Sequence, residues 1–340
     1  MIIRTRANAR IGLIGNPSDG YFGKTISVAI ENFGADVTLW ESPTLQIVPN
    51  PVHDPVEFAS LDTLRETAQR DGYYGGLRLL FATCKKFRDY CDAHGIALEP
   101  RNFTISYATN IPRQVGLAGS SAIITAALKA LMRFYEVTED QLPRPLQPNL
   151  VLSVETEELE IAAGLQDRVI QVYGGMVFMD FARELMEQHG HGAYTPMDPR
   201  LLPRLYLAWV ENPSDSGKIH SDVRFRFNRG DAEVVAAMRA FARYAEEARD
   251  ALERGDSEQL ASLMNANFDL RRRIFGDQVI GPQNLEMIQI ARDLGFASKF
   301  SGSGGAVIGP FHTDADRDRL ERAYTAKGYR FVEIQPQITA

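Results

Sequence analysis

The stretch Pro112–Leu131, PRQVGLAGSSAIITAALKAL, places two glycines and two serines directly before an apolar pattern of helical spacing. Gly116 and Gly119 allow backbone amides to approach an anion closely, because glycine has no side chain. Ser120 or Ser121 can cap the helix, whose first amides then point outward with the positive end of its dipole. The chemistry that this stretch suits is phosphate binding, with an ordinary N-cap and a flexible entrance as the alternative.

Carboxylates follow this loop at two places. The run SVETEELE includes Glu155 and Glu158, which share one helical face, and hard carboxylate oxygens suit Mg²⁺ beside phosphates. Most glutamates in such a run lie on a solvated face, which is the competing role. Asp167 stands in a glycine-flanked loop at a predicted helix start, where the helix dipole stabilises a negative charge. A phosphate and a metal ion are therefore the ligands that these residue types suit.

Two familiar phosphate motifs are excluded. The GKT at Gly23–Thr25 is part of a Walker A pattern, but that pattern needs a glycine where Ser18 stands and a helix after it, whereas ISVAIE is typical of a strand. The GSGG at Gly302–Gly305 lacks the third glycine of a dinucleotide loop, because Val307 occupies its place, and a strand is predicted to follow.

Strands and helices alternate around these residues. Asn102–Pro112 is predicted to be a strand that enters the glycine loop, and helices are predicted at 121–135 and about 151–163. The run Lys24–Trp40 has an alternating pattern that includes β-branched residues, which predicts two strands joined around residues 32–34.

The second half of the chain is predicted to be rich in helix. Two long helical patterns cover Asp231–Arg254 and Ser257–Phe275. The turn-rich segment His189–Arg204 is the best boundary candidate. We therefore expect an α+β protein with one domain at 1–195, carrying the phosphate loop and Asp167, and another at 196–340.

The composition narrows the class of protein. The 340 residues carry 37 Lys and Arg against 44 Asp and Glu, a net charge of −7 without blocks of like charge, so neither a nucleic-acid nor a membrane partner is expected. Cys84 and Cys91 lie two helical turns apart and, with the six histidines, show no zinc-ligand spacing. No apolar run has membrane-spanning length and the N-terminus has no signal-peptide core, which favours a cytoplasmic location. No pattern indicates an oligomeric state.

Three ordered motifs resemble those of the GHMP kinases, the superfamily of the galactokinase, homoserine, mevalonate and phosphomevalonate kinases. They are GLAGSSA after a proline, AGLQDRVIQVYGG and the C-terminal FSGSGGAVIG, while ARIGLIGNPSDGYFG resembles the first, substrate-side motif. Within the superfamily the chain is most similar to the glucuronokinases, over stretches that span Gly15 to Val307. The resemblance implies a two-domain fold, with a ribosomal-protein-S5-domain-2-like N-terminal domain and a ferredoxin-like C-terminal α/β sandwich.

The resemblance also implies a reaction, the transfer of the ATP γ-phosphoryl group to the anomeric hydroxyl of D-glucuronate, giving D-glucuronate 1-phosphate and ADP. Asp167 would accept or orient the proton of the attacking hydroxyl. Glu155, with Ser120 or Ser121, would hold Mg²⁺. The ATP phosphates would lie on Val115, Gly116, Leu117, Ala118, Gly119, Ser120, Ser121 and Ala122. The substrate would contact Asn16, Asp19, Tyr21, Arg113, Arg168 and Lys218, and the supporting glycine loop would comprise Gly302, Ser303, Gly304 and Gly305.

Two choices stay open at this point. The phosphate loop carries one residue more than the common G-L-G-S-S-A form, so Ser120 and Ser121 are both candidate metal ligands. The spacing from Glu155 to Asp167 is one residue longer than the resemblance leads us to expect, so Glu158 is an alternative to Glu155. A guanidinium group fits the substrate carboxylate best, because its fork of donors matches the two oxygens. The candidates for that contact are Arg10, Arg78, Arg113, Arg168 and Arg271–Arg273.

Two other functions compete with this one. The first is another small-molecule kinase of the same fold, acting on galacturonate, another sugar or an isoprenoid alcohol, because fold does not determine substrate. An isoprenoid site would be more apolar than one with Asn16, Asp19 and several arginines. The second is a non-catalytic nucleotide- or sugar-binding regulator, which would lack the base or the metal carboxylate, whereas Asp167 and Glu155 are both present.

Overall fold

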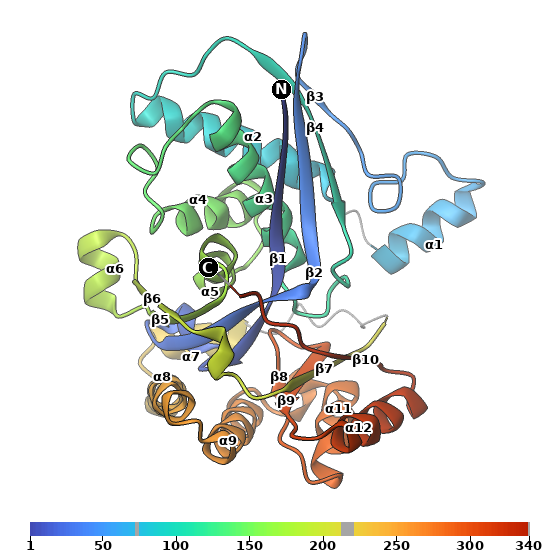
Figure 1. The fold of residues 1–340 in the computed structure, drawn as a ribbon, viewed down its shortest axis with the longest axis vertical. Helices are drawn as coiled ribbons and strands as arrows, with labels where there is room; N and C mark the ends of the chain where they lie inside the picture. The colour runs from blue at the N-terminus through green and yellow to red at the C-terminus, as the bar shows by residue number, and fades with distance from the viewer. Residues whose placement is uncertain (72–74, 212–220, 339–340) are drawn as a thin grey trace. The chain divides into compact units, whose positions relative to one another are not determined.

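The computed structural model describes residues 1–71, 75–211 and 221–338 (Figure 1), so the predicted substrate residue Lys218 lies outside the described residues. The chain forms two compact units, each assembled from separate segments. The first comprises Met1–Asn8, Phe33–Asn110 and Ser120–Ala163, and the second comprises Ala9–Asn32, Ile111–Gly119 and Gly164–Ala340. The units interleave along the chain, and the domain boundary near residue 195 stays a prediction.

The described residues form helices and strands in mixed order. The helices are α1 (Leu61–Asp71), α2 (Leu77–Ala93), α3 (Gly119–Phe134), α4 (Gln147–Ser153), α5 (Leu165–Tyr173), α6 (Arg183–His189), α7 (Ser221–Asn228), α8 (Ala232–Arg254), α9 (Ser257–Phe275), α10 (Asp277–Ile280), α11 (Pro282–Asp293) and α12 (Asp314–Ala326). The strands are β1 (Ile2–Ile14), β2 (Lys24–Ser42), β3 (Gln46–Ile47), β4 (Asn102–Thr109), β5 (Met176–Asp180), β6 (Ala193–Met197), β7 (Leu205–Trp209), β8 (Lys299–Phe300), β9 (Ala306–Pro310) and β10 (Arg330–Glu333). Short 3₁₀ turns cover Ser18–Tyr21 and Pro199–Leu201.

The first unit packs helices on a sheet. The carboxyl part of β2 pairs antiparallel with β4, and β3 pairs parallel with β4. The apolar residues Phe103, Ile105 and Tyr107 of β4 are buried on one face of the strand, and Thr104 between them is buried as well. Phe103 meets Phe134 of α3 edge to face at 5.4 Å between ring centroids. In Figure 1, α2, α3 and α4 lie together on one side of these strands.

The strand β2 corrects one expectation from the sequence. The run was expected to fold back at residues 32–34, but it forms a single strand of 19 residues. Its first residues, Lys24–Val28, pair with β5, and its last residues pair with β4. These long-range pairings outweigh the local turn signal, and the amide of Gly34 is satisfied by the side-chain oxygen of Asn110 at 2.8 Å.

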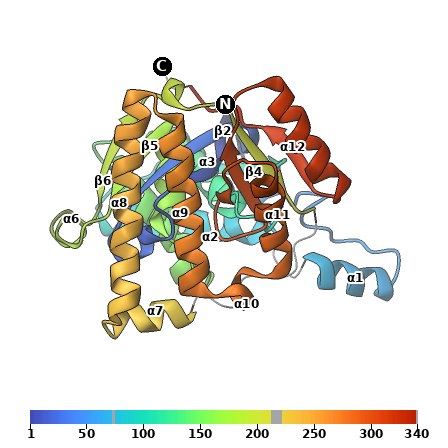
Figure 2. The same ribbon diagram turned by 90° about the horizontal axis from the view of Figure 1, so that it is seen from below.

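The second unit holds an antiparallel sheet of order β10-β7-β9-β8 and a long helix pair. All five residues of β7 are buried, as its continuous apolar run LYLAW predicts. The predicted helices α8 and α9 are confirmed and lie side by side in Figure 2. Asp231 caps α8 by accepting from the amides of Glu233 and Val234, and Gly255 ends it at a φ of +69°.

The helix expected at about 151–163 starts and ends earlier. Helix α4 stops at Ser153, a π-helical turn covers Val154–Glu158, and the helical backbone ends by Leu159. A π turn contains one residue more than an α turn, and such turns are frequent at functional sites. The π turn contains Glu155, so its extra residue accommodates the longer spacing between that glutamate and Asp167.

The helices were also compared with the length of a membrane span. Among the described residues, none is both long enough and apolar enough to cross a bilayer.

Candidate active site

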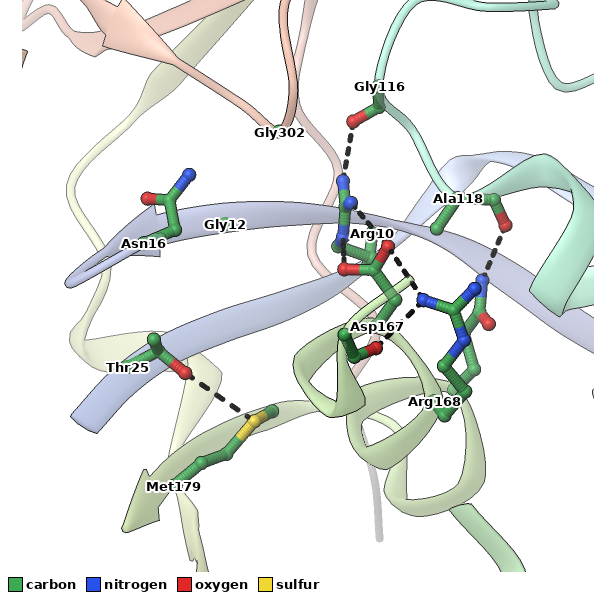
Figure 3. Close-up of polar contacts among 12 residues, drawn as sticks. Arg10, Gly12, Asn16, Thr25, Gly116, Ala118, Asp167, Arg168, Met179 and Gly302 are labelled. Atoms are coloured by element: carbon green, nitrogen blue, oxygen red, sulfur yellow. Dashed lines mark hydrogen bonds and ion pairs between the residues drawn. The ribbon is translucent and has the colours of Figure 1, made fainter. Parts of the chain in front are cut away.

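Asp167 is held by Arg10 of β1 in the second unit (Figure 3). Nε of Arg10 donates to Oδ1 of Asp167 at 2.6 Å, and Nη2 donates to Oδ2 at 2.7 Å, so the guanidinium fork meets both carboxylate oxygens. Nη1 of the same arginine donates to the carbonyl oxygen of Gly116 at 2.5 Å. One buried arginine therefore connects the predicted base to the predicted phosphate loop.

The local sequence explains where Asp167 lies. Gly164 adopts extended backbone and α5 begins at Leu165, so Asp167 falls in the first turn. Further along α5, Val169 and Ile170 pack against β5 residues Val177 and Met179 in a fully buried cluster. This packing holds α5 in place, and with it the first turn, whose Asp167 pairs with Arg10.

The charge state of Asp167 follows from its neighbours. Burial raises the pKa of Asp167, but the charges of Arg10 and Arg168 and the Arg10 hydrogen bonds outweigh this effect, so the pKa lies below its usual value. Arg168 contributes Nη1, which lies 3.4 Å from Oδ2 of Asp167 and also donates to the Gly164 carbonyl at 2.8 Å. Asp167 is therefore an anion at neutral pH.

Asp19 lies close to the same helix start, in the Ser18–Tyr21 turn. Its carboxylate accepts hydrogen bonds from the amides of Gln166 and Gly20, so it caps the first turn of α5. Burial raises the pKa of Asp19 to about 6, with a further contribution from the negative charge of Asp167. A Cβ at Gly164 would lie 2.4 Å from Oδ2 of Asp19, so this close approach requires glycine. The two carboxylates have pKa values displaced in opposite directions.

The phosphate loop packs backbone to backbone on the second glycine loop. A Cβ at Gly116, whose φ is +68°, would lie 2.9 Å from the carbonyl oxygen of Gly304 and 3.0 Å from the amide of Ser303. A Cβ at Gly302 would lie 2.3 Å from the carbonyl oxygen of Gly116. Close approach of the two backbones therefore requires glycine at positions 116 and 302.

Further contacts within the second unit hold the loop in shape. Nε2 of Gln171, on α5, donates to the carbonyl of Ala118 at 2.8 Å. Ala118 has a φ of +62°, a left-handed conformation that costs a non-glycine residue roughly 1 kcal/mol. Helix α3 begins at Gly119, so Ser120 and Ser121 lie in its first turn and not at the N-cap position that the sequence suggested.

In the first unit, Ser120 and Glu155 form a hydrogen-bonded pair. Oγ of Ser120 donates to Oε1 of Glu155 at 2.7 Å, and Glu155 is buried. Ser121 is fully buried. Glu158 instead forms an ion pair of 2.5 Å with Lys85. The geometry distinguishes the two serines and the two glutamates that the sequence left equivalent.

Asn16 is held by two residues that the sequence did not single out. Its Oδ1 accepts from Nζ of Lys299 at 2.9 Å, and that lysine also donates to the carbonyls of Gly12 and Phe300. Asn267 of α9 accepts from the amide of Gly15 and donates to the carbonyl of Asn16. Burial, with the charges of Arg271 and Arg10, holds the pKa of Lys299 well below its usual value. One sequence signal could have pointed to the contact between Lys299 and Asn16, namely a lysine within a short strand.

The other predicted substrate residues differ in their surroundings. Tyr21 is 9% exposed, and its ring packs edge to face on Phe227 at 4.9 Å between centroids. Arg113 is half-buried in the loop that precedes Val115. Arg168 is buried and is directed toward Asp167, as described above.

Two family models match parts of this chain. Residues 78–175 match the model of the GHMP kinases N-terminal domain, and residues 248–330 match that of the GHMP kinases C-terminal domain. Glucuronokinase 1 of Arabidopsis thaliana is 56% identical over 306 residues, which is 90% of this chain and 84% of that protein. The probable glucuronokinase 2 of the same plant is 54% identical, with the same shares of coverage.

Solved structures of low sequence identity share the fold. Galactokinase of Lactococcus lactis, in complex with galactose, superposes with a TM-score of 0.76 at 15% identity, covering 99% of this chain and 94% of that one. A mevalonate kinase structure gives a TM-score of 0.68 at 18% identity, with 99% and 100% covered. The chain therefore has the two-domain mixed α/β fold of these enzymes and belongs to the GHMP kinase family, whose members are ATP-dependent phosphotransferases with an alcohol group as acceptor.

Proposed function

We propose that the protein phosphorylates D-glucuronate at its anomeric hydroxyl with ATP, giving D-glucuronate 1-phosphate and ADP. The observation that best supports phosphoryl transfer is the position of Arg10. This residue binds both oxygens of Asp167 and the Gly116 carbonyl of the phosphate loop. Glucuronate is proposed as the substrate because the two Arabidopsis relatives are named as glucuronokinases. Their identity to this chain over nine tenths of its length supports transferring that substrate to it.

In this proposal the amides of residues 115–122 and the start of α3 bind the ATP phosphates. Phosphoryl transfer mainly requires positioning and neutralisation of charge, which glycine-loop amides and a helix dipole provide. The glycine loop at 302–305 supports this loop from behind, through the close backbone contacts of Gly116.

Ser120 and Glu155 are the proposed Mg²⁺ ligands. A hydroxyl and a carboxylate are the hard oxygen donors that Mg²⁺ prefers, and this ion usually keeps water and phosphate oxygens as its remaining ligands. A set of two protein donors fits that habit. Among residues 1–71, 75–211 and 221–338, no group of three or more His, Cys, Asp or Glu side chains could hold a metal ion. Glu158 is the weaker candidate because it is paired with Lys85. Bound Mg²⁺ would neutralise charge on the phosphates.

Asp167 receives the substrate proton in this proposal. A carboxylate of lowered pKa is a weak base, so its main role is to orient the anomeric hydroxyl and to take the proton late in the transfer. The anomeric hydroxyl is more acidic than an ordinary alcohol, so a strong base is not required. Arg10 keeps Asp167 ionised and fixed in direction.

The substrate is expected to contact the turn that contains Asn16, Asp19 and Tyr21. The hydrogen bonds that Lys299 and Asn267 make to Asn16 support a rigid turn. Arg113 and Arg168 stay candidate contacts, and so does Lys218, which lies outside the described residues.

The test is release of ADP by the purified protein with Mg-ATP. The panel contains D-glucuronate, D-galacturonate, D-glucose, D-galactose and mevalonate, with a control that lacks an acceptor. Turnover confined to glucuronate would support the proposal. Turnover on another acceptor would show that the protein is a kinase with a different substrate. Binding of ATP without turnover on any acceptor would favour a non-catalytic regulator.

A further inference from the structure

Arg224 of α7 lies on the Ser18–Tyr21 turn within the second unit. The carbon of its guanidinium group is 4.5 Å from the centroid of the Tyr21 ring. Its Nη1 donates to the carbonyl of Gly20 at 2.8 Å. Phe227, one turn further along the same helix, packs on the same tyrosine ring. Arg224 and Phe227 of α7 thus both lie on Tyr21, in the turn where the sugar is proposed to bind.

Gly20 gives the guanidinium group its room. A Cβ at this position would lie 2.8 Å from Nη2 of Arg224, so a larger residue would push the arginine off the turn. The guanidinium lies over the Tyr21 ring, donates to the Gly20 carbonyl and also hydrogen-bonds to the Tyr21 side chain. A guanidinium group has five N–H groups, so these contacts leave further donors for a ligand.

The neighbouring arginines are engaged elsewhere. Arg10 and Arg168 are directed to Asp167. Arg226 pairs with Asp231 and Glu233 of the α8 start. Arg271 is buried and donates to the carbonyls of Gly302 and Ser303, away from solvent. In contrast, Arg224 is exposed, and across the described part of the chain no carboxylate forms an ion pair with it.

We propose that Arg224 binds the carboxylate of the sugar-acid substrate and so selects an acid over a neutral sugar. A planar guanidinium with several donors is the group that best matches a carboxylate. Arg224 binds the carbonyl of Gly20, the residue that follows Asp19, so the hydroxyl-binding turn and the acid-binding group can act on one small molecule. This inference rests on the proposed glucuronate kinase activity. The sequence did not single out Arg224 because it is one of several arginines in a helical segment.

The test compares D-glucuronate with D-glucuronamide, in which a neutral amide replaces the carboxylate. For the unchanged protein, kcat/KM should favour the acid. In Arg224→Gln the preference should fall about 10- to 100-fold, the range that loss of a charge-assisted hydrogen bond gives, through a higher KM for the acid and an unchanged value for the amide. Arg229→Gln is the matched control, because Arg229 is exposed directly after α7 and stacks on Phe225, and it should keep the preference.

The outcomes separate this inference from the proposed function. Equal losses on the acid and the amide in Arg224→Gln would mean that the arginine only shapes the turn, and an unchanged preference would mean that it does not read the carboxylate. Either result overturns the inference while the kinase activity stands. Arg224→Lys keeps the charge but not the fork, and it should retain part of the preference. If the unchanged protein does not phosphorylate glucuronate, the proposed function itself fails.

Discussion

Two carboxylates of the second unit, Asp19 and Asp167, illustrate how the surroundings of a residue set its chemistry. Both are held near the start of α5, but Asp167 faces Arg10 and Arg168, whereas Asp19 faces backbone amides and the charge of Asp167. Their pKa values therefore move in opposite directions, which is the pattern of groups with separate roles in one site. Asp167 is the permanent anion, and Asp19 binds and releases a proton near neutral pH.

Replacing Asp167 with Asn should lower kcat by about 10²- to 10⁴-fold, because the variant loses the group that we propose orients the hydroxyl and takes its proton. The KM for ATP should change little. Steady-state ADP release measures both. Asp180→Asn is a matched control, because it also removes a partly buried carboxylate paired with a cation, Lys24, and it should keep kcat within a few fold. Normal turnover in Asp167→Asn would refute the assigned role.

Replacing Asp19 with Asn should stabilise the unliganded protein at neutral pH. Because folding raises the pKa of Asp19 from 3.8 to about 6, the folded state binds the proton more tightly, and the free energy of unfolding falls as pH rises through this interval. Above pH 6 the ionised carboxylate costs about 3 kcal/mol, and near pH 4.5 about 1 kcal/mol. Urea unfolding at pH 7.5 and 4.5 measures both gains. A gain that does not depend on pH would contradict the raised pKa.

At the scale of elements, two glycine-rich loops act as one support. The backbones of the loop before α3 and the loop before β9 approach closely at Gly116 and Gly302, and Arg10 and Gln171 hold the first loop from β1 and α5. Glycine is needed at these two positions because a side chain there would separate the backbones. The loop geometry is therefore a property of four elements together.

Replacing Gly116 with Ala should lower the free energy of unfolding by about 2 to 3 kcal/mol, because a left-handed alanine costs roughly 1 kcal/mol and the new methyl group meets the Gly304 carbonyl. The displaced loop should raise the KM for ATP. Gly95→Ala is the control, because Gly95 has a similar φ of +66° with open space around its Cβ position. It should show only the backbone cost and an unchanged KM. Equal effects in the two variants would refute the close contact.

At the scale of the whole molecule, the end of the chain closes onto an early strand within the second unit. The carbonyl of Gln335 accepts from the amide of Glu31 at 2.8 Å, and the amide of Gln337 donates to the carbonyl of Ala29 at 2.8 Å. Oδ1 of Asn32 accepts from the amide of Gln335. These bonds cover an edge of β2 that would otherwise lack partners.

Deleting residues 335–340 should therefore lower the free energy of unfolding by about 2 to 4 kcal/mol, at about 1 kcal/mol for each lost hydrogen bond. Urea unfolding checks this value. Gln335→Ala is the control, because it keeps the backbone bonds and should unfold like the parent protein. A truncated protein of full stability would show that this segment contributes nothing to β2.

The sequence by itself determined the features that depend on neighbours within a few turns. Helices α8 and α9 were predicted from their helical pattern, which is a local property of the sequence, and the structure adds an Asp cap at the start of each. The glycine loop before α3 and the start of α5 at Asp167 were also local signals, and the ordered motifs placed the chain in its family. Such features need no knowledge of distant contacts.

Only the tertiary structure decided which distant side chains meet. Arg10 and Asp167 are 157 positions apart, Lys299 and Gly12 are 287 apart, and Arg224 and Gly20 are 204 apart, so no local pattern links them. The same reason explains β2, where pairing with β4 and β5 outweighed a turn signal. Long-range contacts depend on how sheets and helices pack, and that packing paired Asp167 with Arg10, Glu155 with Ser120 and Arg224 with the Gly20 carbonyl.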